Sequence, residues 1–217
     1  MRETTCAYCG ALAAAGTREH VIPRCLYPRS KSASRVQRLT VVACAQCNNG
    51  WADDEAHFRN VLLLAGEPNE VVREIWKTSA ARSFVEPDGK RRLRDLIDQM
   101  KPIQISDAER HMIYPGEDAR VMRVVRKVIR GLCFHHRLPS PVADSQVWAD
   151  VLKYVVPQEF LDEMPIHHRE KDIVEYRYLP LTYEDMDSLW LLTFFERRTF
   201  IGVVSKPGVS SAGGTAA

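Results

Sequence analysis

Apolar residues recur along this chain with two different periods, and each period predicts a different kind of element. In residues 117–136 they return every three or four positions, at Val121, Val124, Val125, Val128, Ile129 and Leu132, which is the spacing of one helix face. Weaker patterns predict helices over residues 69–85, 90–100 and 145–155, with a turn at 87–89. Residues 173–179 alternate as a strand, and 189–195 and 199–204 are predicted to form a hairpin. We therefore expect a mainly helical region that ends in a small antiparallel sheet.

The first 60 residues have a different pattern, typical of a small α+β unit. Residues 17–22 are predicted to form a short strand that ends at Pro23, and residues 39–43 a second strand. Residues 24–38 between them should be an exposed loop, and a helix should begin at Asn48. The chain then divides into a unit at 1–60, a second region at 61–205 and a disordered tail at 206–217.

Four cysteines in two matched pairs suggest a structural metal site in the first unit. Cys6 and Cys9 form one Cys-x-x-Cys pair, and Cys44 and Cys47 form the other. Two residues between thiolates allow one tight turn to aim both sulfurs at one ion, so the four thiolates are predicted to hold one structural Zn²⁺. Cys25 and Cys133 fit no pair, and we interpret them as small buried hydrophobic residues.

Composition and charge narrow the class of protein. The chain has 217 residues, 45% hydrophobic and 27% charged, which is enough for a substantial core. Its longest apolar runs are far shorter than the roughly 20 residues of a membrane helix, and no signal segment is seen, so a cytoplasmic protein with reduced thiols is expected. The net charge is only +2, but a basic cluster lies between the cysteine pairs, at Arg18, Arg24, Arg29, Lys31, Arg35 and Arg38. Such a cluster suits a polyanionic substrate.

Three residues near the cysteines have the chemistry of a second, catalytic metal centre. His20 can accept a proton near neutral pH, Glu19 beside it offers a carboxylate, and Asn48 after the last cysteine offers an amide oxygen. Hydrolysis of a phosphodiester requires an activated water and a stabilised leaving oxygen, which one divalent cation and one histidine can supply. The pattern indicates a nuclease.

The combination of Cys-x-x-Cys, Glu-His-Val-Ile-Pro and Val-Val-Ala-Cys-x-x-Cys-Asn-Asn-Gly-Trp resembles the HNH endonucleases, the ββα-metal nucleases, in their zinc-bearing form. The resemblance covers about the first quarter of the chain. It implies two short strands and a helix around a metal, with Glu19 and Asn48 as ligands of Mg²⁺ or Mn²⁺ and His20 as the general base. Two positions depart from the family pattern: Glu19 stands where Asp is usual, and the region of Gln37 to Thr40 lacks the family's middle asparagine.

Other candidates have simpler interpretations. His57 is nine positions after Asn48, about 180° away on a regular helix, so we expect a surface or interdomain role. Glu55 is expected to be a solvated acid, and Trp51 a core anchor. The adjacent histidines at 135–136 and at 167–168 point apart, which argues against metal sites. The basic face of the 120–130 helix is expected to be solvated surface, with contact to nucleic acid as the alternative.

Two hypotheses of function follow. The first is a metal-dependent HNH endonuclease that hydrolyses DNA, with the C-terminal region selecting substrate, a partner protein or a second copy of the chain. The second is a zinc-ribbon module that binds nucleic acid without catalysis. RNA as the substrate of the same residues stays open.

Overall fold

The computed structural model describes residues 4–13, 16–28, 38–106, 109–170 and 172–208. Most of the loop predicted at 24–38 and most of the predicted tail lie outside these residues. The described part of the chain is α+β, with helices and a small antiparallel sheet, as the sequence pattern predicts. No helix in it combines the length and the apolar character that crossing a bilayer requires.

The N-terminal unit consists of short strands followed by two helices. Its elements are β1 (Thr4–Thr5), β2 (Leu12–Ala13), β3 (Thr17–His20), η1 (Arg24–Leu26), β4 (Thr40–Ala43), α2 (Ala45–Asn49) and α3 (Ala52–Leu64). β3 and β4 pair antiparallel, with Glu19 opposite Val41 and His20 opposite Thr40. The expected strand pair is therefore present. The predicted helix begins earlier, because Cys44 caps α2, and it is interrupted at Gly50 and Trp51 before α3 begins.

The central part is mainly helical. It contains α4 (Glu70–Ile75), a π-helical segment η2 (Trp76–Ala80), α5 (Ala81–Val85), α6 (Pro87–Gln99), the strands β5 (Lys101–Ser106) and β6 (Glu109–Ile113), and α7 (Ala119–His135). The turn predicted at 87–89 is wrong, since these residues form the first turn of α6. Proline at the first helical position needs no hydrogen-bonding N–H, which makes Pro87 a suitable start. The β5–β6 hairpin was not predicted.

The C-terminal part forms a five-stranded antiparallel sheet in the order β7-β11-β10-β9-β8. Its elements are η3 (Asp144–Gln146), β7 (Val147–Val151), α8 (Gln158–Asp162), β8 (Ile166–Glu170), β9 (Val174–Pro180), β10 (Met186–Phe194) and β11 (Arg198–Ser205). The predicted hairpin is present, and Trp190 lies opposite both Tyr178 and Gly202. The helix predicted at 145–155 is wrong: β7 pairs there with β11, and this pairing overrides a local pattern that fits either structure.

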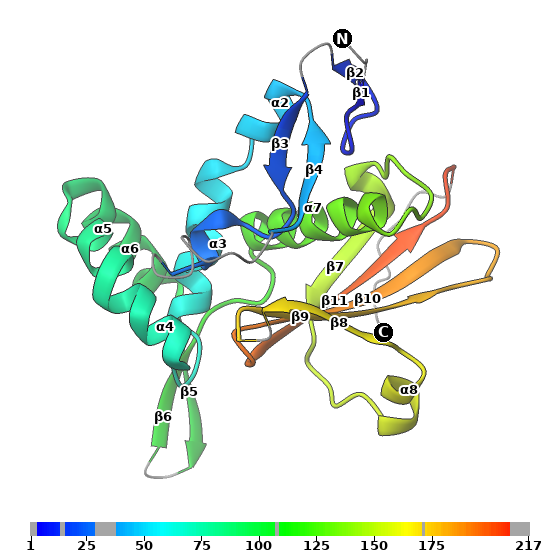
Figure 1. The fold of residues 1–217 in the computed structure, drawn as a ribbon. Helices are drawn as coiled ribbons and strands as arrows, with labels where there is room; N and C mark the ends of the chain where they lie inside the picture. The colour runs from blue at the N-terminus through cyan, green and yellow to red at the C-terminus, as the bar shows by residue number, and fades with distance from the viewer. Residues whose placement is uncertain (1–3, 14–15, 29–37, 107–108, 171, 209–217) are drawn as a thin grey trace.

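Helix α7 lies between the N-terminal unit and the sheet (Figure 1). All six apolar residues that predict it are buried, and α7 contacts β7 and β11 of the sheet as well as α3 and β4 of the N-terminal unit. Gly131 allows a close approach on the N-terminal side, because an added Cβ would lie 2.9 Å from the Tyr8 hydroxyl and 3.0 Å from Val21. One core of buried residues therefore extends from Cys6 through α7 to the sheet.

Candidate functional site

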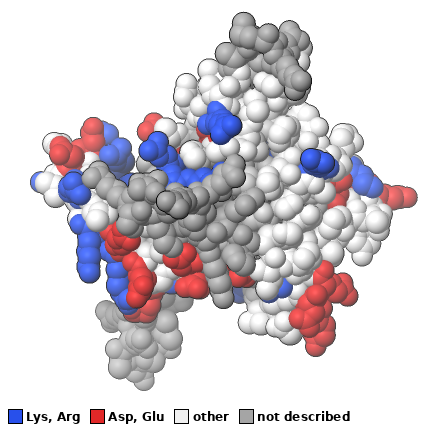
Figure 2. Space-filling model, in the orientation of Figure 1, with Lys and Arg blue, Asp and Glu red and all other residues white. Residues whose placement is uncertain are grey.

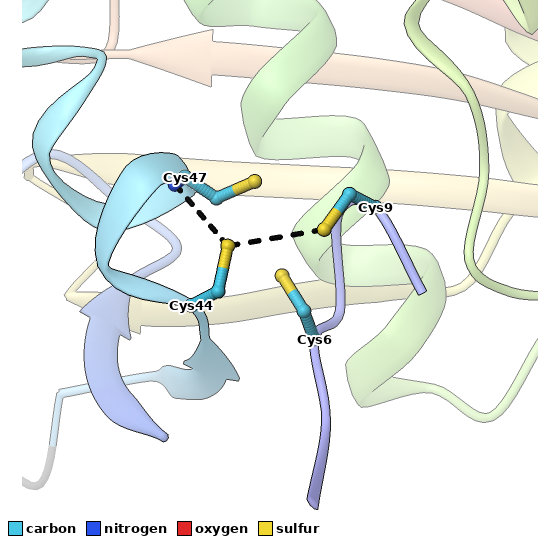
Figure 3. A group of neighbouring side chains, drawn as sticks. All are labelled: Cys6, Cys9, Cys44 and Cys47. Atoms are coloured by element: carbon cyan, nitrogen blue, oxygen red, sulfur yellow. Dashed lines mark hydrogen bonds between the residues drawn. The ribbon is translucent and has the colours of Figure 1, made fainter. Parts of the chain in front are cut away.

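Four sulfurs meet at the end of the N-terminal unit. Cys6 and Cys9 lie in the turn between β1 and β2, and Cys44 and Cys47 lie at the start of α2, with the side chains pointing toward one another (Figure 3). All four Sγ atoms lie within 4.8 Å of one another, and those of Cys9 and Cys44 are 3.8 Å apart. Tetrahedral zinc with bonds of about 2.3 Å needs sulfurs about 3.8 Å apart. The cluster could therefore hold a metal ion such as zinc.

Local backbone structure positions these thiols. Gly10 has a φ of 73°, a conformation that glycine adopts easily, and its N–H donates to the Cys6 carbonyl at 3.0 Å to close the first turn. In the second turn, the Cys47 N–H donates to Cys44 Sγ at 3.5 Å. Burial acts to raise the pKa of Cys6, but backbone hydrogen bonds, led by the one at Cys44, outweigh it and lower the pKa to about 6. A thiolate is thus favoured at Cys6, whereas burial and the neighbouring thiols raise the pKa of Cys47.

The proposed general base, His20, lies at the end of β3. Burial lowers the pKa of His20, and the positive charges of Arg38, Arg24 and Lys127 lower it further, so the ring is neutral at pH 7 and able to accept a proton. Its Nδ1 atom is buried and has no hydrogen-bond partner among the described residues. Among the described residues 38–40, no side chain therefore bonds to Nδ1 to orient the ring.

The proposed metal ligand Glu19 is buried and bound to a lysine from α7. Lys127 is fully buried, and its Nζ donates to Glu19 Oε1, to Glu55 Oε1 at 2.5 Å and to the His20 backbone carbonyl at 2.8 Å. We call Glu19, Glu55 and Lys127 the lysine centre. Burial and the charge of Glu55 raise the pKa of Glu19, while Lys127 acts in the opposite direction. Glu55 is therefore not a solvated acid, and the backbone of His20 is held from α7.

Asn48, the other proposed ligand, lies in α2, which packs against β3. Glu19, His20 and Asn48 thus come from two elements in contact, but Thr17, and not His20, pairs with Ala43, the residue that precedes Cys44. A hollow of about 520 Å³ borders Thr40 and Val41, the residues opposite His20 and Glu19, and also His135 and Arg137. His20 and Asn48 do not line this hollow.

The donor types at this site suit a hard divalent cation, since carboxylate and amide oxygens are the ligands that Mg²⁺ and Mn²⁺ prefer. The contacts of Glu19, however, affect its availability as a metal ligand. Its Oε1 already binds one cation, the Lys127 ammonium. A divalent ion at Glu19 would share this carboxylate with Lys127.

The basic residues of α7 form ion pairs and hydrogen bonds within the fold, although Arg120 and Arg123 are also exposed to solvent. Arg120 and Arg123 both bind Asp54, at 3.1 and 2.8 Å, and Arg126 binds Asp144 at 3.0 Å. Arg130 donates to the Tyr8 and Val142 carbonyls at 2.5 and 2.7 Å. The expectation of a solvated face is therefore confirmed only in part: Arg120 and Arg123 are exposed at the surface, whereas Lys127 and Arg130 are buried. Figure 2 shows basic and acidic side chains interspersed at the left of the visible face, over α5 and α6.

Trp51 and His57 also lie in this interface. Trp51 is buried against Tyr8, with ring centroids 6.2 Å apart, which confirms it as a core anchor. His57 is buried, and its Nε2 lies 2.7 Å from Asp118 Oδ2, at the residue that caps α7. The surface alternative for His57 is therefore wrong, and its role is to join α3 to α7.

Comparison of the chain with protein-family models, with curated proteins and with solved structures finds no match.

Proposed function

We propose that this protein is a metal-dependent endonuclease of the HNH type that hydrolyses phosphodiester bonds in DNA. The observation that carries the proposal is the placement of His20. It ends β3, the strand that contacts the helix bearing Asn48, and it directly follows the buried carboxylate of Glu19 in the chain. Its lowered pKa suits a base that must be neutral at physiological pH.

In phosphodiester hydrolysis, each of these residues would have a separate role. His20 takes a proton from the attacking water, and Lys127 fixes the His20 backbone through its carbonyl. Arg24 and Arg38, whose charges act on His20, favour the approach of a polyanionic strand. Glu19 and Asn48 would hold Mg²⁺ or Mn²⁺, which when bound offsets negative charge on the phosphate and on the leaving oxygen.

Substitution of His20 tests the proposal. We expect His20→Ala to lower Mg²⁺- or Mn²⁺-dependent cleavage of plasmid DNA by about 100-fold or more, because the water loses its base. Zinc content and circular dichroism should stay as in the wild type. His167→Ala is the matched control, since His167 lies on β8 of the sheet, and it should cleave normally. Equal cleavage by the wild type and His20→Ala would refute the assignment.

A second function is favoured by one observation, the bond between Glu19 and Lys127. A carboxylate that is neutralised within the fold would suit a zinc module that binds nucleic acid without cleaving it. Such a module would bind DNA or RNA equally well with His20 or Ala at position 20 and would cleave neither. The same assay on single-stranded RNA distinguishes an RNA nuclease from a DNA nuclease.

A further inference from the structure

The lysine centre has the composition of a cation site. The Lys127 ammonium is surrounded by three oxygen atoms from three parts of the fold: Glu19 Oε1 in β3, Glu55 Oε1 in α3 and the His20 carbonyl. Carboxylate and backbone carbonyl oxygens are also the ligands that proteins offer to hard divalent cations. The side chain of Lys127 is 0% exposed, and those of Glu19 and Glu55 are 9% and 16% exposed.

The charges of the centre do not balance. Two carboxylates face one ammonium, so the group carries a formal charge of −1 when both acids are ionised. Without the ammonium, two buried carboxylates would face each other unpaired, which is costly unless another cation or a proton joins them. The centre therefore needs a cation, and the chain supplies one from α7.

We propose that Lys127 is a tethered competitor for divalent cations at Glu19. Its ammonium and a divalent ion use the same carboxylate, so Lys127 weakens divalent binding there, and removal of its charge opens a site formed by Glu19, Glu55 and the His20 carbonyl. This inference rests on the proposed function only in assigning the divalent ion to Glu19.

Binding of Mn²⁺ to the zinc-loaded full-length protein tests this inference without a nuclease assay. Free Mn²⁺ is counted by electron paramagnetic resonance for the wild type, for Lys127→Met and for Lys153→Met. Methionine keeps much of the length of lysine but carries no charge. We expect Lys127→Met to bind Mn²⁺ at least about tenfold more tightly than the wild type, because a nearby positive charge is removed. Lys153→Met is the control, since Lys153 pairs with Asp150 at the end of β7, and it should match the wild type.

Two further variants assign the new binding to the lysine centre. Glu19→Gln in the Lys127→Met background should abolish the gain, and Glu55→Gln in the same background should reduce it. If Lys127→Met alone is poorly folded, Mn²⁺ should raise its melting temperature, because an ion that binds only the folded state stabilises it. The Glu55→Gln double variant, with one buried carboxylate fewer, gives a second folded background for the same titration.

Mn²⁺ binding by Lys127→Met that equals the wild type would overturn the inference, as would a gain that persists after Glu19→Gln. The proposed function is judged separately, by plasmid cleavage of the wild type against His20→Ala. If cleavage depends on His20 but Mn²⁺ affinity is unchanged in Lys127→Met, the proposed function stands and the proposed competition by Lys127 is refuted. If Lys127→Met binds Mn²⁺ more tightly but the wild type does not cleave DNA, the proposed competition stands and the proposed nuclease function is refuted.

Discussion

The sulfur cluster and the lysine centre both belong to the N-terminal unit or contact it, and they are built in opposite ways. The cluster takes its possible ligands from two turns, Cys6 to Cys9 and Cys44 to Cys47, and could hold a separate metal ion. The lysine centre joins residues 72 and 108 positions apart, and its cation is a side chain. The first centre can be emptied by a chelator, whereas the second can be emptied only by mutation.

The largest effect should come from emptying the sulfur cluster. We expect Cys44→Ser, or removal of zinc by a strong chelator, to unfold the N-terminal unit, because a structural zinc contributes on the order of 10 kcal/mol to a fold of this size. Circular dichroism and zinc content measure the change. Cys25→Ser is the control and should retain zinc, since Cys25 lies outside the cluster and donates to the Glu55 carbonyl. A chelated protein that melts at the temperature of the zinc-loaded protein would contradict a structural role for the ion.

Emptying the lysine centre should have a smaller effect. We expect Lys127→Met to reduce the free energy of unfolding by about 3–5 kcal/mol in the absence of divalent ions, because it leaves two carboxylates without their cation. Urea unfolding at pH 7 measures the loss. Neutralising the acids as well, in Glu19→Gln/Glu55→Gln/Lys127→Met, should recover part of it. If the triple variant is no more stable than Lys127→Met, the loss comes from packing and not from unpaired charge.

The smallest effect should come from the contact that fixes the start of α7. Burial alone would raise the pKa of Asp118, but hydrogen bonds from His57 and Tyr114 outweigh it and hold the pKa well below its usual range. We expect Asp118→Asn to lower the free energy of unfolding by about 1.5–3 kcal/mol at pH 7. A depressed carboxyl pKa stabilises the fold above the unfolded pKa of about 3.9, and this contribution is lost as the pH falls through the folded pKa.

The pH dependence of that difference is the decisive measurement. Urea unfolding of the wild type and Asp118→Asn should differ most at pH 7, and the difference should shrink progressively as the pH falls below about 4. A difference that is constant from pH 7 to pH 3 would show that the carboxylate charge of Asp118 is not what holds α7 in place.

Local spacing made some features of this fold predictable. Two residues between cysteines are enough to indicate the sulfur cluster, and the heptad-like return of valines in α7 marks its buried side. Strands β3 and β4 follow from their β-branched residues. In each case the residues that predict an element belong to that element, or to the one turn that positions them.

Features that depend on distant partners were not predictable. The pattern of residues 147–151 fits a helix or a strand, and their pairing with β11 determines that they form a strand. Lys127 looks like one more cation on a basic helix face, and the sequence does not say which acids it will meet. The assignment of catalytic ligands to Glu19 and Asn48 stays a prediction for the same reason.

The burial of α7 on both sides has a consequence for any attempt to transfer the N-terminal unit into another protein. Cut free near residue 60, the fragment would keep Glu19 and Glu55 but lose the amine that neutralises them, and it would expose Tyr8 and Val21 where Gly131 now rests. A transferred unit would need another positive charge beside these two carboxylates. The smallest part of this molecule that supplies one includes α7, which begins more than fifty positions after residue 60.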